Sequence, residues 1–185
     1  PLRLDVVPLL LEQPGHDPRQ PGGGVVWAEG EEESAQGLTE AQRTLAWLHA
    51  NGYGVEQSDA EARRWFTTAA EAGDATAQCA VAAMHQFGRY DAEKDPQRVV
   101  YWYRKAAEQS YARAQFALGK LLAHGDLIEQ DDEAAFCWLT LAIVNGSEPA
   151  KKELSMLTAR LDEQTLEAYK SRMLESMQRH PAGRA

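Results

Sequence analysis

Two histidines and a cysteine are the residues of this sequence that could take part in metal chemistry. His49 and His85 are 36 residues apart, and Cys79 lies close to the second of them. Imidazole nitrogens and thiolate sulfurs bind zinc or copper, so these groups would form a metal site if they met in space. The same interval, however, separates other residues that recur along the chain. We therefore interpret both histidines as half-buried packing residues and expect no metal and no cofactor.

Other combinations that support catalysis are incomplete. A nucleophilic Cys79 would need a neighbouring base and a third group that orients the base, and no such motif is present. The glycine-rich stretch PGGGVVW, residues 21–27, lacks the lysine and the strand-to-helix context of a phosphate-binding loop. No Gly-x-Ser-x-Gly motif occurs. We expect no catalytic residues and a protein that is not an enzyme.

Composition excludes several further classes of protein. The chain has 185 residues and a net charge of −9, from 28 acidic and 19 basic residues, so it lacks the basic balance of a nucleic-acid-binding protein. Its longest apolar run, DVVPLLL, is too short to span a bilayer. The two cysteines, Cys79 and Cys137, do not make a disulfide framework. We interpret them as buried helix residues, with a single bridge as the alternative.

The elements that carry these residues repeat along the chain. The pair Ala-Gln at 41–42 recurs at 77–78 and 114–115, at spacings of 36 and 37. Glycine, tryptophan and alanine recur in step with it. A period in this range indicates stacked supersecondary units. The recurring positions are Gly52, Gly88 and Gly125; Trp65, Trp102 and Trp138; and Ala69, Ala106 and Ala142.

Each unit reads as two helices. The first ends at the recurring glycine, which tolerates the left-handed conformation of a helix end. The second begins at Ser58, Asp95 or Asp131, whose side chains can accept the free N–H groups of a first turn. Small alanines permit two helices to cross closely, and the tryptophans fill the space between units. Gly73 and Gly146 end two of the second helices, and Ser110 takes that position in the middle one.

The pattern divides the chain into four parts. Residues 1–39 are expected to form an irregular arm or linker, because they are rich in proline, glycine and acidic residues. The three repeats span 40–75, 76–112 and 113–147. Residues 148–179 suit amphipathic capping helices with a break near Leu161, and 180–185 a tail.

The blocks GYGVEQSDAEARRWFTTAAEAGDATAQ and KDPQRVVYWYRKAAEQSYARAQFALGKLLAHG resemble Sel-one-like repeats (SLR), relatives of the tetratricopeptide repeat. Ala46 and Ala82 replace a family glycine that Gly119 retains, and the turn GRYDAEKD has one extra residue. The resemblance implies an all-α fold, an α-solenoid (right-handed superhelix) of three helix-turn-helix repeats. It also implies a non-enzymatic module for protein–protein interaction.

Residues on the first helices that the repeat does not fix are the candidates for binding a partner. Trp47 is the strongest of them, because aromatic residues and arginines dominate interface energetics. The full set is Arg43, Trp47, Gln86, Phe116 and Lys120. The acidic balance suits a partner with a basic surface. Within the family, we favour a bacterial adaptor or an effector-neutralising (immunity) protein that binds a toxic effector.

Two alternatives remain open. Some exported relatives are associated with β-lactam binding, so the resemblance also allows an exported enzyme or a binder of β-lactam or peptidoglycan-type ligands. The chain could instead be a structural piece of a longer solenoid. Because some bacterial members are exported, we expect the periplasm or cell envelope rather than the cytoplasm.

Overall fold

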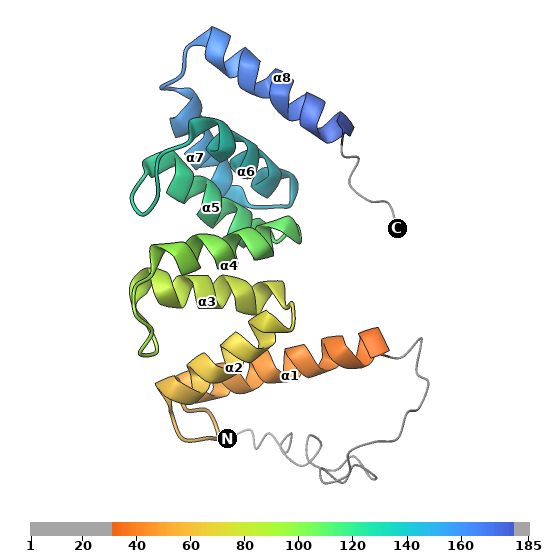
Figure 1. Cartoon of the computed structure of the whole chain (residues 1–185), viewed down its shortest axis with the longest axis vertical. Helices are drawn as coiled ribbons and strands as arrows, with labels where there is room; N and C mark the ends of the chain where they lie inside the picture. The colour runs from red at the N-terminus through yellow and green to blue at the C-terminus, as the bar shows by residue number, and fades with distance from the viewer. Residues whose placement is uncertain (1–30, 180–185) are drawn as a thin grey trace.

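The computed structural model describes residues 31–179, which form eight α-helices and no strands. The helices stack along the long axis of the molecule, from α1 and α2 at one end to α7 and α8 at the other (Figure 1). Their bounds are α1 Glu31–Asn51, α2 Asp59–Glu71, α3 Ala75–Phe87, α4 Pro96–Glu108, α5 Ala112–His124, α6 Asp132–Val144, α7 Glu148–Thr158 and α8 Glu163–Arg179.

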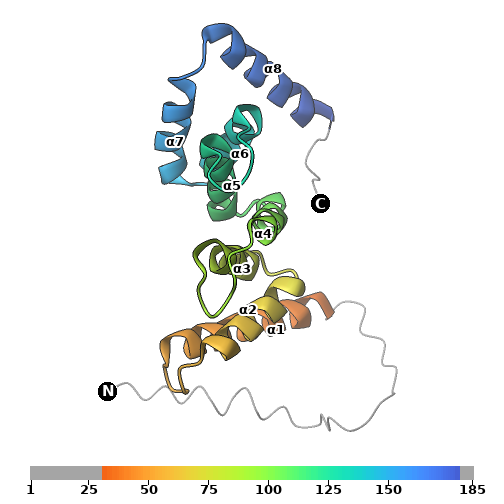
Figure 2. The ribbon, with the colours of Figure 1, turned by 60° about the vertical axis from the view of Figure 1, so that its left-hand side comes forward.

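Consecutive helices pair into three hairpins, α1 with α2, α3 with α4 and α5 with α6. Each hairpin packs on the next one, as two views of the ribbon show (Figures 1 and 2). This arrangement confirms the predicted all-α solenoid. Since neighbouring units bury each other's apolar faces, the core consists of successive clusters along the stack.

The predicted helix starts are confirmed. The Ser58 hydroxyl accepts a hydrogen bond from the backbone N–H of Glu61 at 3.2 Å. The carboxylate of Asp95 accepts from the N–H of Gln97 at 3.0 Å, and that of Asp131 accepts from the N–H of Ala134 at 2.9 Å. Each cap satisfies a donor that has no partner within its helix, which fixes where the second helix of each unit begins.

The predicted helix ends are also confirmed. Gly88 and Gly125 end α3 and α5 with φ of 66° and 70°, in the left-handed region that glycine adopts without strain. Ser110 follows α4 with φ of 62°, although it has a side chain. A non-glycine residue in this region costs about 1 kcal/mol, so the middle unit ends at a strained position.

The recurring alanines and tryptophans pack differently from each other. Ala69, Ala106 and Ala142 are fully buried, as expected for helices that cross closely. The tryptophans, which are predicted to fill the space between units, are only partly buried. Trp102 contacts the core clusters of both neighbouring units, so it joins units although one side of it faces solvent.

Gly119 is retained because α6 crosses α5 closely there. A Cβ built on this glycine would lie 2.8 Å from Cγ of Leu139 and 3.2 Å from its backbone nitrogen. The equivalent Ala46 and Ala82 are fully buried, so the first two units accommodate one methyl group at this position. The departure from the family pattern is therefore a local difference in how closely the two helices approach.

The predicted end of the N-terminal arm, residue 39, lies too far along the chain. Helix α1 begins at Glu31, so residues 31–39 are helical rather than part of an irregular arm. The stretch EEESAQGLT contains no proline and several good helix formers, and its acidic residues favour a helix N-terminus. The rest of the predicted arm, 1–30, and the predicted tail, 180–185, lie outside the described residues.

Two helices follow the third unit, with the expected break between them. Helix α7 ends at Thr158, and α8 begins at Glu163 after a turn in which the Asp162 carboxylate accepts from the N–H of Thr165 at 2.8 Å. Pro149 lies in the first turn of α7, where its missing N–H has no cost. Over residues 31–179 no helix combines the length and the apolarity that crossing a membrane requires.

Candidate functional site

A groove of about 810 Å³ crosses the first helices of the three units. We call it the first-helix groove, because α1, α3 and α5 supply most of its lining, with contributions from the turns that follow α3 and α5. The structure brings all the predicted partner-binding residues to it: Arg43, Trp47, Gln86, Phe116 and Lys120.

The register of the repeat explains why this surface is hollow. The groove uses the same face of each first helix, at positions i, i+3, i+4 and i+7. On the middle helix, α3, these positions carry the small residues Thr76, Cys79, Ala80 and Ala83. At three of these positions the flanking helices carry larger residues, namely Arg43 and Trp47 on α1 and Arg113, Phe116 and Lys120 on α5. At i+4 the flanking residues Thr44 and Ala117 are small as well.

Two large aromatic side chains in the groove are accessible to a partner. Trp47 is 52% exposed and stacks on Tyr53, with ring centroids 5.1 Å apart. Phe87 is 56% exposed, and the guanidinium of Arg89 lies 5.6 Å from its ring centroid. A partner that covers these rings would remove apolar surface from water, which is favourable.

Gln86 is held in place by a tyrosine from the second helix of its own unit. The hydroxyl of Tyr103 donates to Oε1 of Gln86 at 2.9 Å. Burial raises the pKa of Tyr103 well above its ordinary value, so the hydroxyl stays protonated and remains a donor. The contact fixes the Gln86 amide at the edge of the groove.

Arg43 is already engaged within the molecule. Its Nη1 donates to Oδ2 of Asp74 at 2.7 Å, while Oδ1 of Asp74 accepts from the N–H of Ala77 and caps α3. Arg43 also lies 3.5 Å from Glu40. It therefore links α1 to the start of α3, which is a structural role in addition to its place in the groove.

The charge of the groove is opposite to that of the chain. Its lining holds the basic residues Arg43, Arg89, Arg113 and Lys120 but a single acidic residue, Asp126. Among residues 31–179, no carboxylate lies within ion-pair distance of Arg89, Arg113 or Lys120. The net charge of −9 suggested a basic partner, but it is a sum over the whole chain. The local charges of the groove do not support that expectation.

The Cys79 thiol faces the groove but is not poised for nucleophilic attack. Burial raises its pKa to about 11, and the charge of Arg113 lowers it by a smaller amount. The thiol is therefore protonated at neutral pH, whereas the thiolate is the reactive form. Cys79 and Cys137 are both free, so the alternative of a bridge between them is wrong.

His49 and His85 stabilise the turns within their units. Nδ1 of His49 lies 3.1 Å from the carbonyl oxygen of Glu56, and Nδ1 of His85 lies 2.8 Å from that of Glu93. A carbonyl only accepts, so each ring donates to the turn that follows its helix. Within the described part of the chain, no three His, Cys, Asp or Glu side chains form a group that could hold a metal ion.

Three consecutive repeats are recognised in this sequence, at residues 39–74, 75–111 and 112–147, each as a Sel1 repeat. The chain belongs to the Sel1 repeat family. Each Sel1 boundary lies within one residue of the boundary predicted from the sequence spacing.

Solved structures share the Sel1 fold. The chain is similar to a Sel1 repeat protein from Oxalobacter formigenes, with a TM-score of 0.59 and 32% identity, covering 68% of this chain and 98% of that one. The cysteine-rich protein HcpB of Helicobacter pylori has a TM-score of 0.53 at 19% identity, covering 72% of this chain and all of HcpB, which is a likeness of fold alone.

Two curated fungal proteins are also similar to this Sel1 chain. Chitin synthase regulatory factor 3 of Schizosaccharomyces pombe is 28% identical over 96 residues, which is 51% of this chain and 10% of that protein. Chitin synthase regulator SKT5 of Saccharomyces cerevisiae is 30% identical over 112 residues, which is 60% of this chain and 16% of that protein. The chain therefore spans only a small part of these curated relatives.

The first-helix groove also contains Arg113, Arg89 and Tyr90, which are absent from the predicted set. Arg113 lies three and seven residues before Phe116 and Lys120, so helical spacing alone could have placed it on the same face. Arg89 and Tyr90 come from the turn with the extra residue, whose path the repeat pattern does not specify.

The extra residue in that turn is accommodated by an unusual backbone. Tyr90 and Asp91 both have φ of 55°, and their carbonyl oxygens accept hydrogen bonds from Nη1 of Arg63. Arg63 is half-buried, and these two hydrogen bonds join the second Sel1 unit to the first.

Proposed function

We propose that the chain binds a segment of another protein in the first-helix groove. Sel1 repeats form interaction modules, and this groove crosses the first helices of all three repeats. The observation that carries the proposal is a contrast at two sets of equivalent positions. Cys79 and Ala83 of α3 are small, whereas the equivalent residues are large: Arg43 and Trp47 on α1, and Phe116 and Lys120 on α5. That contrast leaves space for an extended segment between two walls of large side chains.

The role that best fits this surface is that of an adaptor. The two fungal relatives are named as regulators of chitin synthase, which supports a family role in acting on other proteins. The prediction of a bacterial immunity protein draws no support from these relatives and stays a prediction. The β-lactam alternative likewise draws no support from these relatives and stays a prediction.

A substitution that fills the groove tests the proposal. Ala83 lies at the position where the neighbouring units carry Trp47 and Lys120, so the repeat accepts a large side chain there. Ala83→Trp should occupy the groove without unfolding the chain. Ala159→Trp, at an exposed position after α7, adds the same side chain elsewhere and serves as the control.

The readout is the set of proteins recovered from an extract of the native cell. We expect Ala83→Trp to lose the partners that wild type and Ala159→Trp both retain. Thermal unfolding followed by circular dichroism checks that all three proteins fold. If the folded Ala83→Trp variant recovers the same partners as wild type, the groove is not the binding surface.

A further inference from the structure

Three cations of the first-helix groove are not neutralised by the molecule itself. Arg113 and Lys120 are exposed on α5, seven residues apart and therefore on the same face of the helix. Arg89 lies in the turn after α3, beside the ring of Phe87. Arg43 differs from these three because Asp74 and Glu40 already bind it.

These cations share one hollow surface, whereas the other basic residues of the range 31–179 that have no ion pair lie outside the groove. Several exposed basic residues elsewhere have a carboxylate one helical turn away, as in Arg64 with Glu61 and Lys151 with Glu148. The groove instead gathers basic side chains in a protein whose net charge is −9. Positive charges without an ion-pair partner attract a ligand of opposite charge and repel one of the same charge.

Apolar surface lies between the charged positions. The small side chains of Ala80 and Ala83 leave room, and Trp47 and Phe116 border them from α1 and α5. An apolar side chain inserted there would gain contact area against two aromatic rings. The groove therefore offers a site for one large apolar group flanked by sites for negative charges.

We propose that the occupant of the first-helix groove is an acidic segment of a partner protein, with a large apolar side chain between its carboxylates. The apolar side chain lies over Ala80 and Ala83, and the carboxylates pair with Arg113 and Lys120 on one side and with Arg89 at the end. The inference rests on the proposed function of the groove and adds the chemistry of the partner.

Selection from a random peptide library tests the inference directly. The full chain is immobilised and screened against displayed peptides of roughly ten residues, which extend over about 33 Å. We expect the enriched peptides to carry Asp or Glu on either side of an aromatic or large aliphatic residue. Enrichment of basic or uncharged peptides, or failure to enrich any peptide, overturns the inference.

Charge reversal then shows which cations matter. An enriched acidic peptide, labelled with fluorescein, is titrated with wild type and with Arg113→Glu/Lys120→Glu. The control is Arg104→Glu/Lys152→Glu, which makes the same change of charge at exposed positions on α4 and α7 outside the groove. We expect affinity to fall by about tenfold or more in the groove variant and by much less in the control. Equal losses in the two variants contradict the proposed pairing.

The same titration separates the two proposals. If basic or neutral peptides are enriched and Ala83→Trp abolishes their binding, the groove is the binding surface but its preferred charge is wrong. If enriched peptides bind Ala83→Trp as well as wild type, both proposals fail. Sedimentation of the full chain tests whether a second copy of the chain occupies the groove instead. A dimer that dissociates in the variant Arg113→Glu/Lys120→Glu would mean that it does, which also overturns the inference.

Discussion

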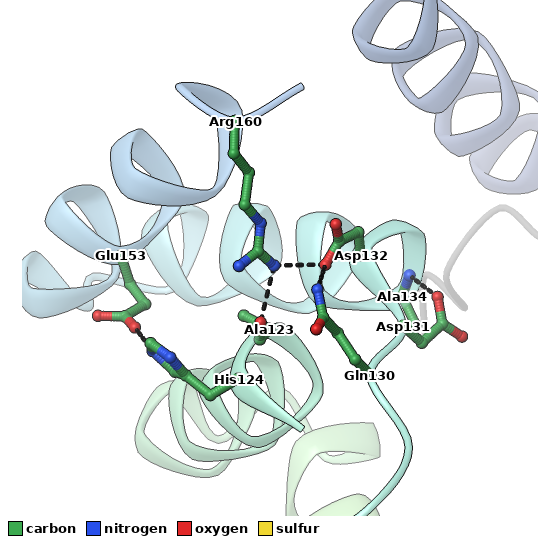
Figure 3. Close-up of polar contacts among 8 residues, drawn as sticks. All are labelled: Ala123, His124, Gln130, Asp131, Asp132, Ala134, Glu153 and Arg160. Carbon is green, nitrogen blue, oxygen red and sulfur yellow. Dashed lines mark hydrogen bonds and ion pairs between the residues drawn. The ribbon is translucent and has the colours of Figure 1, made fainter. Parts of the chain in front are cut away.

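The two ends of the stack differ in how completely their polar groups find partners. At the C-terminal end, helix α7 and the turn after it bind the last unit through side chains (Figure 3). Arg160 donates to the carbonyl oxygen of Ala123 at 2.7 Å and pairs with Asp132, and His124 pairs with Glu153. These contacts, together with the buried Leu157, cover the third unit as a further repeat would.

At the N-terminal end, a buried acceptor is left without a partner. Oε1 of Gln42 is buried and receives no hydrogen bond from any residue of the described range 31–179. The equivalent Gln78 accepts from Gln109, and Gln115 accepts from Asn145, both at 2.8 Å. Gln109 and Asn145 are the C-caps of α4 and α6, whereas the C-cap of α2 is Ala72, which has no side-chain donor.

This difference shows what the recurring Ala-Gln pair does. Each buried glutamine also donates to the preceding unit, Gln78 to the carbonyl oxygen of Ala70 and Gln115 to that of Ala107, both at 3.1 Å. The glutamine therefore joins the end of one second helix to the end of the next. Its polar groups are satisfied only when residues on both sides provide partners, and within residues 31–179 the first unit has no donor for Oε1 of Gln42.

Removing the apolar anchor of the C-terminal cap should have the largest effect. Leu157→Ala leaves a cavity where a 2% exposed side chain packs between α7 and the third unit. We expect the free energy of unfolding to fall by about 2–5 kcal/mol, measured by urea denaturation. Met156→Ala, next to it but 51% exposed, should change stability by less than about 0.5 kcal/mol. Similar losses from both variants would mean that α7 does not cover the core.

Glutamine substitutions compare a satisfied unit with the first one. Gln78→Leu leaves the Ala70 carbonyl and the Gln109 amide without their shared partner, so we expect a loss of about 1–3 kcal/mol. Gln42→Leu removes an acceptor that is already unpaired, and stability should change by less than about 0.5 kcal/mol. Urea denaturation measures the free energy of unfolding of the two variants. Equal losses would refute the role assigned to the glutamine.

A smaller effect is expected from the polar contacts of the cap. Arg160→Ala removes the donor to Ala123 and the ion pair with Asp132, which are partly open to water. We expect a loss of about 1 kcal/mol by thermal or urea denaturation. Lys151→Ala, which breaks an exposed pair within α7, is the control and should be close to neutral.

The sequence was sufficient for the repeat architecture because periodic positions carry it. The glycine ends, the Ser58, Asp95 and Asp131 caps and the unit boundaries all follow from residues that recur. The groove was partly predictable, since the candidates on first helices do converge there. The pairing of Arg43 with Asp74 and the path of the turn at Tyr90 depend on contacts between units, which spacing within one unit does not specify.

The N-terminal deficiency should be repairable with a residue that the third unit already uses. Ala72→Asn places at the C-cap of α2 the same side chain that donates to Gln115 from Asn145 at the C-cap of α6. The new amide can donate to Oε1 of Gln42, so we expect a gain of about 0.5–1 kcal/mol, less than a full buried hydrogen bond because an exposed side chain becomes ordered. The gain should vanish when the same substitution is made together with Gln42→Leu, which a double-mutant cycle in urea measures. A gain that persists without Gln42 would come from the helix end itself and not from the unpaired acceptor.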